Sequence, residues 1–124
     1  MRETMARTYQ GLAWLLLAGL VVQTYFAGAF LFGAALPQIH GMWGYLFWLI
    51  TPVTVVLALA GGLGRRAVIL SAVLVLLTTV QVQLPHMRAA LPWVAALHPV
   101  NALAMLGVTL AMALRASPAV RRTW

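Results

Sequence analysis

The sequence contains no cysteine, and its only acidic residue is Glu3. The lack of cysteine excludes disulfides, thiolate metal sites, iron–sulfur clusters and covalently attached c-type haem. No apolar span contains Asp or Glu, which disfavours proton pumps and cation-coupled transporters because these commonly rely on intramembrane carboxylates. Phosphate-binding glycine loops, nucleophile elbows and His-Glu-x-x-His zinc motifs are also missing. Few side chains are therefore left that could carry acid–base or metal chemistry.

Charged residues are scarce, at 7% of 124 residues, whereas hydrophobic residues make up 64%. Soluble chains are typically about 45–50% apolar and about 25% charged, so this composition predicts a membrane protein. The long Leu, Val and Ala runs lack the alternation of a transmembrane β-barrel, which favours helices. The length is that of a single domain over residues 1–124.

Four apolar segments are long enough to cross about 30 Å of hydrocarbon, which takes roughly 20 residues each. We expect spans at about 9–36, 40–61, 66–84 and 93–114, separated by proline-rich or glycine-rich breaks. Short connections make neighbouring helices antiparallel, so the predicted fold is all-α, an up-down-up-down four-helix transmembrane bundle. No internal repeat is convincing, although the second and fourth spans both begin with a histidine.

Two prolines fall at informative positions. Pro52 should kink the second span, and the hydroxyl of Thr51 or Thr54 can cover the carbonyl that proline leaves free. Pro99 suits the first turn of a helix. The last helix therefore either starts at His98, after a short interfacial helix, or continues from Trp93 with a kink.

The basic residues are all arginine, and they lie at span ends rather than on one face, so we exclude nucleic-acid binding. Seven share one side of the predicted bundle: Arg2, Arg7, Arg65, Arg66, Arg115, Arg121 and Arg122. Only Arg88 lies on the other side, so the positive-inside rule predicts that both termini lie in the cytoplasm. The first apolar run is also similar to a secretory signal, but it continues to Leu36 and we expect a retained helix.

The three histidines, His40, His86 and His98, lie at the predicted outer edge. The second and fourth spans run in the same direction, so His40 and His98 should face each other. A bis-histidine b-type haem needs two axial nitrogens on opposite faces of the iron, and this pair could supply them. The structural alternatives are a helix cap or interfacial residue for His40 and a backbone-bonded helix start for His98. His86 lies in a proline-containing connection, and we expect a solvated bystander.

Other residues could complete such a site. Gly44 follows His40 by about one turn and removes bulk that a macrocycle must clear, and Arg88 could pair with the propionates. Met42 and Met87 are alternative sixth ligands. The amide side chains that could orient a ligand imidazole are Gln81, Gln83 and Asn101. For Gln23 and Thr24, in the middle of the first span, we expect hydrogen bonds that hold helices together.

The pattern His-x-x-x-Gly over residues 40–44, with a partner histidine on another span, resembles bacterial four-helix b-type cytochromes. That class includes superoxide oxidase and ferric-reductase-like transmembrane proteins. The segment 96–103, Ala-Leu-His-Pro-Val-Asn-Ala-Leu, is similar to small uncharacterised bacterial four-helix membrane proteins. The resemblance implies haem binding or electron transfer, and it implies a multi-pass protein of the bacterial inner membrane. Typical di-haem members have four ligand histidines, so three histidines allow at most one bis-histidine haem b.

The sequence leaves more than one function open. The first is a single-haem b-type protein that transfers electrons near the outer membrane face, with a quinone or a larger membrane complex as partner. The alternative is a non-catalytic accessory subunit of a larger complex, without a cofactor. A third is a small metal-binding or transport protein, since three histidines alone could hold zinc or copper. Nothing in the sequence decides whether the chain is an enzyme.

Overall fold

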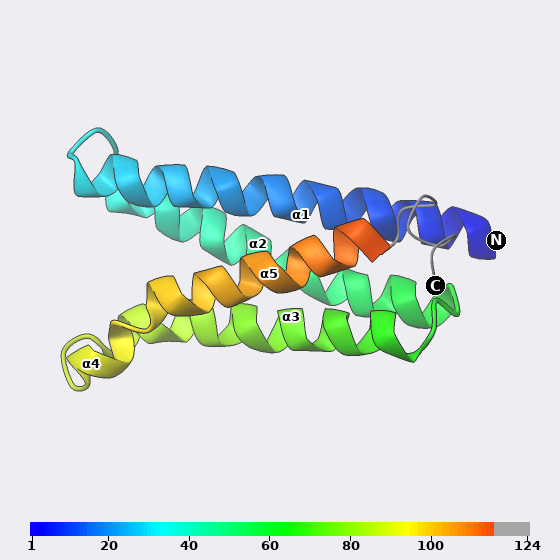
Figure 1. Ribbon diagram of the computed structural model, residues 1–124. Helices are drawn as coiled ribbons and strands as arrows, with labels where there is room; N and C mark the ends of the chain where they lie inside the picture. The colour runs from blue at the N-terminus through cyan, green and yellow to red at the C-terminus, as the bar shows by residue number, and fades with distance from the viewer. Residues whose placement is uncertain (116–124) are drawn as a thin grey trace.

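A computed structural model describes residues 1–115, which form a helical bundle without strands (Figure 1). The long helices are α1 (Arg2–Leu31), α2 (Pro37–Ala60), α3 (Arg65–Gln83) and α5 (His98–Arg115). A 3-10 turn, η1 (Leu84–Met87), and a short helix, α4 (Pro92–Ala95), connect α3 to α5. The described residues contain four helical segments long and apolar enough to cross a membrane. This confirms the predicted fold class and implies contact with a lipid bilayer.

The helix bounds differ from the predicted ones at the end of the bundle where the histidines lie. α1 stops at Leu31, five residues before the predicted end, because the chain turns at Gly33, which has a positive φ of 72°. α2 begins at Pro37, a position where a helix tolerates proline. His40 therefore lies inside the first turn of α2 and does not open it.

The fourth span is divided in two. α4 ends at Ala95, and α5 begins at His98, so Pro99 lies in the first turn of a separate helix. Of the two arrangements that the sequence left open, the structure has the short helix followed by a new start. This places the His98 side chain at the very beginning of α5.

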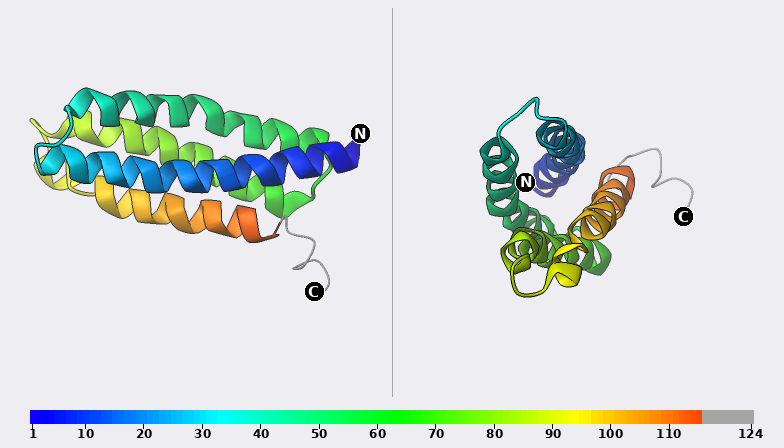
Figure 2. Two further views of the ribbon diagram at one scale, coloured as in Figure 1. Left: turned by 90° about the horizontal axis from the view of Figure 1, so that it is seen from above. Right: turned by 90° about the vertical axis from the view of Figure 1, so that its left-hand side faces the viewer.

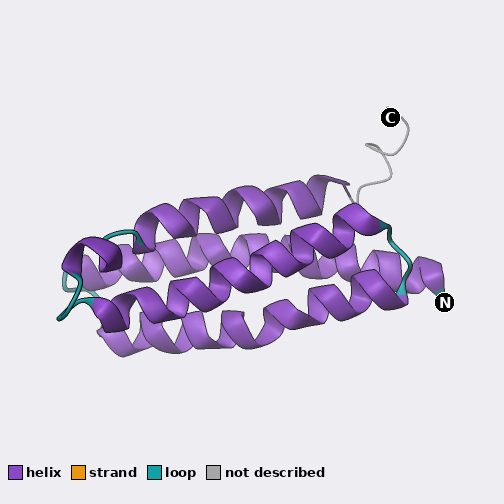
Figure 3. Cartoon of the chain, turned by 90° about the horizontal axis from the view of Figure 1, so that it is seen from below, coloured by secondary structure: helices purple, strands orange, loops and turns teal. Residues whose placement is uncertain are grey.

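The four long helices pack in a ring in which α1 contacts α2 and α5, and α3 contacts the same two helices (Figure 2). α1 and α3 are therefore diagonal to each other, as are α2 and α5. Figure 3 shows that the described loops lie at the two ends of the bundle. The N-terminus lies at the end opposite to α4 (Figure 1).

The long helices of residues 1–115 form two helical hairpins, α1–α2 and α3–α5, whose residues correspond at an offset of 58 positions. The offset relates His40 to His98 and Gln23 to Gln81. It also pairs buried residues: Ala13 with Ser71, Leu16 with Leu74, Leu20 with Thr78, Phe47 with Met105, Thr51 with Thr109 and Thr54 with Met112. α1 thus corresponds to its diagonal partner α3, and α2 to α5, so the pseudo-twofold axis runs along the bundle.

Our conclusion from the sequence that no internal repeat is convincing was therefore wrong. The two hairpins match in burial pattern more than in residue identity, because an apolar interior accepts many side chains of similar size. The connections also differ, since α1 and α2 are joined by a single turn, whereas η1 and α4 separate α3 from α5.

Hydroxyl groups line part of the interior. Thr51 donates a hydrogen bond to the carbonyl oxygen of Trp48 at 3.0 Å, and this is the carbonyl that Pro52 leaves without its helical partner. The predicted role of Thr51 is confirmed. Thr51 also lies 3.1 Å from the hydroxyl of Thr78, which joins α2 to α3. In an apolar bundle each such hydroxyl needs a partner within the protein.

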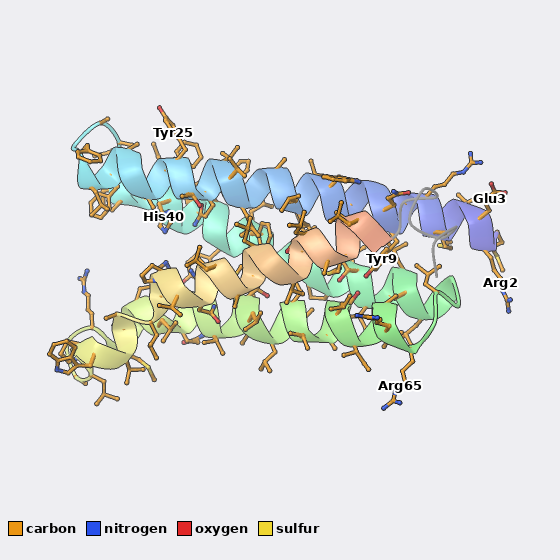
Figure 4. All side chains as sticks on the ribbon, viewed as in Figure 1. Arg2, Glu3, Tyr9, Tyr25, His40 and Arg65 are labelled. Carbon is orange, nitrogen blue, oxygen red and sulfur yellow. The ribbon has the colours of Figure 1, made fainter. Side chains whose placement is uncertain are left out.

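The described arginines gather mainly at one end. Arg2 and Arg65 point outward at the end that holds the N-terminus (Figure 4). Arg88 follows η1, at the opposite end. This arrangement agrees with the predicted asymmetry, but the side that faces the cytoplasm stays a prediction. Arg121 and Arg122 lie outside the described residues.

We predict that Thr51→Val lowers the free energy of unfolding by about 1–2 kcal/mol, because it leaves the Trp48 carbonyl buried without a donor. The matched control is Thr109→Val at the equivalent position. There the hydroxyl donates to the Met105 carbonyl, in a helix that has no proline at the next position. The control should cost only about 0.5 kcal/mol. Reversible unfolding in mixed micelles measures both, and equal losses would contradict the assigned role of Thr51.

Candidate functional site

The structure brings His40 and His98 together from the diagonal helices α2 and α5. Their ring centroids are 6.0 Å apart and the ring planes are inclined by 66°. Both side chains are partly buried. His40 lies on the inner side of α2, towards the end of the bundle where α4 is found (Figure 4). The predicted convergence of these two imidazoles is confirmed, whereas their role as ligands stays a prediction.

Each histidine is held by a glutamine from the preceding helix of its own hairpin. The Nδ1 of His40 lies 3.3 Å from the backbone carbonyl oxygen of Gln23, and the Nδ1 of His98 lies 3.1 Å from that of Gln81. A carbonyl only accepts, so these contacts assign the ring proton to Nδ1. In each ring Nε2 is then left with a free lone pair.

The side chains of the same glutamines approach that second nitrogen. The amide nitrogen of Gln23 lies 3.4 Å from Nε2 of His40, and that of Gln81 lies 3.2 Å from Nε2 of His98. Each amide can donate to the Nε2 lone pair while the backbone carbonyl accepts from Nδ1. Each histidine and its glutamine are separated by 17 residues. The two Gln–His units are therefore equivalent under the internal repeat.

One substitution makes the two units unequal. Asn101, on the second hairpin, donates from its amide nitrogen to the carbonyl oxygen of Leu77 at 2.9 Å and to Oε1 of Gln81 at 2.6 Å. The equivalent residue on the first hairpin is Trp43, whose single N–H is used by the Gly19 carbonyl at 3.1 Å. No donor is left for Oε1 of Gln23. This oxygen is buried and has no hydrogen-bond partner in the described structure.

Gly44 lies beside the side-chain amide of Gln23. A Cβ at this position would lie 3.1 Å from the amide nitrogen of Gln23, whereas a Cβ at Gly41 would meet nothing within 4 Å. The lack of a side chain at Gly44 therefore makes room for the amide that contacts His40. The predicted role of Gly44 as clearance for a macrocycle stays a prediction.

His86 belongs to a different contact. Its Nε2 lies 3.0 Å from the hydroxyl of Tyr45, in an exposed position on η1. Within residues 1–115 no group of three or more His, Cys, Asp or Glu side chains could hold a metal ion. The structure thus pairs His40 with His98 and keeps His86 apart, as the sequence predicted. The site offers two nitrogen ligands, which does not favour a three-histidine zinc or copper centre.

The remaining candidate residues fall into two groups. Gln81 and Asn101 hold His98 in place, as the sequence predicted for residues that orient an imidazole. Arg88 and Gln83 are exposed at the same end of the bundle, and Met42 and Met87 have exposed fractions of 73% and 40%. Met42 lies two positions after the inward-facing His40, on another side of the helix, so its outward position disfavours it as a sixth ligand.

Sequence reasoning missed the part that Gln23 plays at the site. We expected a hydrogen bond between helices, and the structure does show one, but the partner is a site histidine. The available signal was the equal spacing of Gln23 to His40 and of Gln81 to His98. A search for chemistry-bearing residues at a constant offset would have found both units.

We predict that Gly44→Ala displaces the Gln23 amide and disturbs His40 but not His98. Gly41→Ala is the matched control, because a Cβ there meets nothing and both changes improve intrinsic helix propensity by about 1 kcal/mol. Nitrogen NMR of ¹⁵N-histidine-labelled protein in micelles reports each ring separately. In the parent protein both site rings should show protonated Nδ1. Equal responses to the two variants would refute the predicted contact.

Comparison with models of known protein families, with curated proteins and with solved structures found no match.

Proposed function

We propose that the chain binds one b-type haem between His40 and His98 and takes part in electron transfer in the membrane. The observation that carries this proposal is the pairing of two partly buried imidazoles across the axis of an apolar bundle. Intramembrane ionisable residues commonly mark functional sites.

The two imidazoles match the spacing that a shared iron would require. Each ring nitrogen in a metal–imidazole pair lies about 2 Å from the ion, so two ligand rings have centroids about 6 Å apart. The observed separation is 6.0 Å. The Nδ1 contacts to backbone carbonyls leave Nε2 as the ligating atom on both rings, and they fix the ring orientation. When bound, the haem would supply a reversible one-electron couple.

The other residues have supporting roles in this proposal. Arg88 is exposed at the same end of the bundle and could pair with propionates at the aqueous edge. The Gln23 and Gln81 amides contact the Nε2 atoms in the present structure, so both must move when a metal binds. The electron partner would be a quinone or a larger complex in the bacterial inner membrane. Resemblance to four-helix b-type cytochromes supports the same reading.

The second candidate is an accessory subunit without a cofactor, and one observation favours it. In the second hairpin the polar network closes on itself, since Asn101 donates to Gln81, and Gln81 in turn approaches His98. Such a network satisfies the imidazole without a ligand and holds α3 against α5. The first hairpin lacks this closure, because Oε1 of Gln23 has no partner in the described structure. This unpaired oxygen in the first hairpin favours a ligand-binding site over a purely structural network.

We predict that protein purified from haem-replete cells shows a Soret band and sharp α and β bands on reduction. His40→Ala or His98→Ala should abolish the low-spin spectrum, because each would remove one of the two nitrogens that would hold the iron. His86→Ala is the matched control and should leave the spectrum unchanged. Absorption spectra of the three variants in the same detergent make the comparison. A colourless parent protein, or an unchanged spectrum in His98→Ala, would reject the haem proposal.

A further inference from the structure

A groove of about 270 Å³ lies on the second hairpin, between α3 and α5, close to His98 in the chain. Its lining residues are Val80, Leu84, Leu97, Val100, Asn101 and Ala104. Val80, Leu97 and Val100 have exposed fractions of 39%, 51% and 59%, so the groove opens outward. On a bundle that spans a membrane, this outer surface faces lipid.

The internal repeat indicates what kind of group fits there. The equivalents of Leu84, Asn101 and Ala104 on the first hairpin are Phe26, Trp43 and Leu46, which are all larger. The rings of Phe26 and Trp43 pack edge to face there, with centroids 5.9 Å apart. The first hairpin thus places two aromatic rings where the second hairpin has the groove. A flat, apolar ring from outside the chain would restore the same packing.

The polar group in the groove adds a chemical requirement. Asn101 uses its amide nitrogen on the Leu77 carbonyl and on Gln81, on the inner side of α5. The amide nitrogen also lies 3.7 Å from the sulfur of Met105, so every side-chain hydrogen bond of Asn101 in the described structure involves its nitrogen, and the oxygen stays available as an acceptor. Asn101 is the one polar residue in the lining. An acceptor without a donor selects a ligand that carries a hydroxyl or N–H group.

We propose that the groove binds the ring of a quinol, the reduced form of a lipid-soluble quinone, with one hydroxyl donating to the side-chain oxygen of Asn101. This proposal rests on the proposed function, because it names the site and the redox form of the membrane partner. The volume is slightly below the range of about 300–1,000 Å³ for pockets that enclose a drug-sized ligand, so one ring fits and the tail extends into lipid. Asn101 and Gln81 link the groove to Nε2 of His98 through contacts of 2.6 and 3.2 Å.

The test is equilibrium binding of a short-tailed benzoquinol, kept reduced, to the full chain in phosphatidylcholine nanodiscs. Ala104→Leu copies Leu46 of the first hairpin and fills the groove without touching the histidines. We expect saturable binding of one quinol per chain, weakened at least about tenfold by Ala104→Leu. Gly107→Leu is the matched control. It adds the same side chain one turn further along α5, where a Cβ meets nothing within 4 Å, and should leave binding unchanged.

Two further ligands test the chemistry. The dimethyl ether of the same quinol keeps the ring but loses the donor, and it should bind at least about tenfold more weakly. Dodecanol, an alkyl chain without a ring, should not displace the quinol. Binding that ignores Ala104→Leu, equal binding of the ether, or displacement by dodecanol would overturn the proposal. Quinol binding that behaves as expected in a protein without haem would keep the groove and reject the haem site, so the two failures are distinguishable.

Discussion

The structure depends on one constraint, which is that polar groups inside a membrane-spanning bundle must find their hydrogen-bond partners within the protein. Thr51 donates a hydrogen bond to the carbonyl that Pro52 leaves free. The two histidines each donate from Nδ1 to the backbone carbonyl of a glutamine on the neighbouring helix. These contacts also join helices, so the same bonds that satisfy buried groups set how α1 meets α2 and how α3 meets α5. The same contacts therefore determine where each imidazole lies and which of its ring nitrogens carries the proton.

The unequal surroundings of the two histidines are the feature most relevant to function. Asn101 donates a hydrogen bond to the amide oxygen of Gln81 in the second Gln–His unit. Trp43 donates to the Gly19 carbonyl instead, and the amide oxygen of Gln23 has no donor in the described structure. An unpaired buried polar atom costs about 1–3 kcal/mol, so the first unit is in the less stable arrangement. The Gln23 amide nitrogen also donates to the backbone carbonyl of His40 at 3.0 Å, a contact that has no counterpart at Gln81 among the described residues, so the first unit relies on the amide nitrogen alone and the second unit uses both ends of the amide. The two sides of the site thus differ in whether the glutamine oxygen has a hydrogen-bond donor.

Much of the fold and part of the site could be predicted from the sequence. Span number, helical class and the meeting of His40 with His98 follow from hydropathy and from antiparallel packing, which depend on chain-wide patterns. The end of α1 and the role of Gln23 could not be predicted in this way. The first depends on a backbone turn at Gly33, and the second on a contact with one atom of a specific partner. Local geometry of this kind leaves little trace in composition or periodicity.

The two-hairpin arrangement has a topological consequence. A hairpin of two spans starts and ends on the same side of a membrane, so a second copy joined in tandem inserts in the same direction. Arg7 and Arg65, which are equivalent under the offset, then share a side without any new charge signal. A dimer of single hairpins would have two identical histidines related by its twofold axis. In a single chain the two halves can carry different residues at equivalent positions, as Trp43 and Asn101 show, and the site then has two distinct faces.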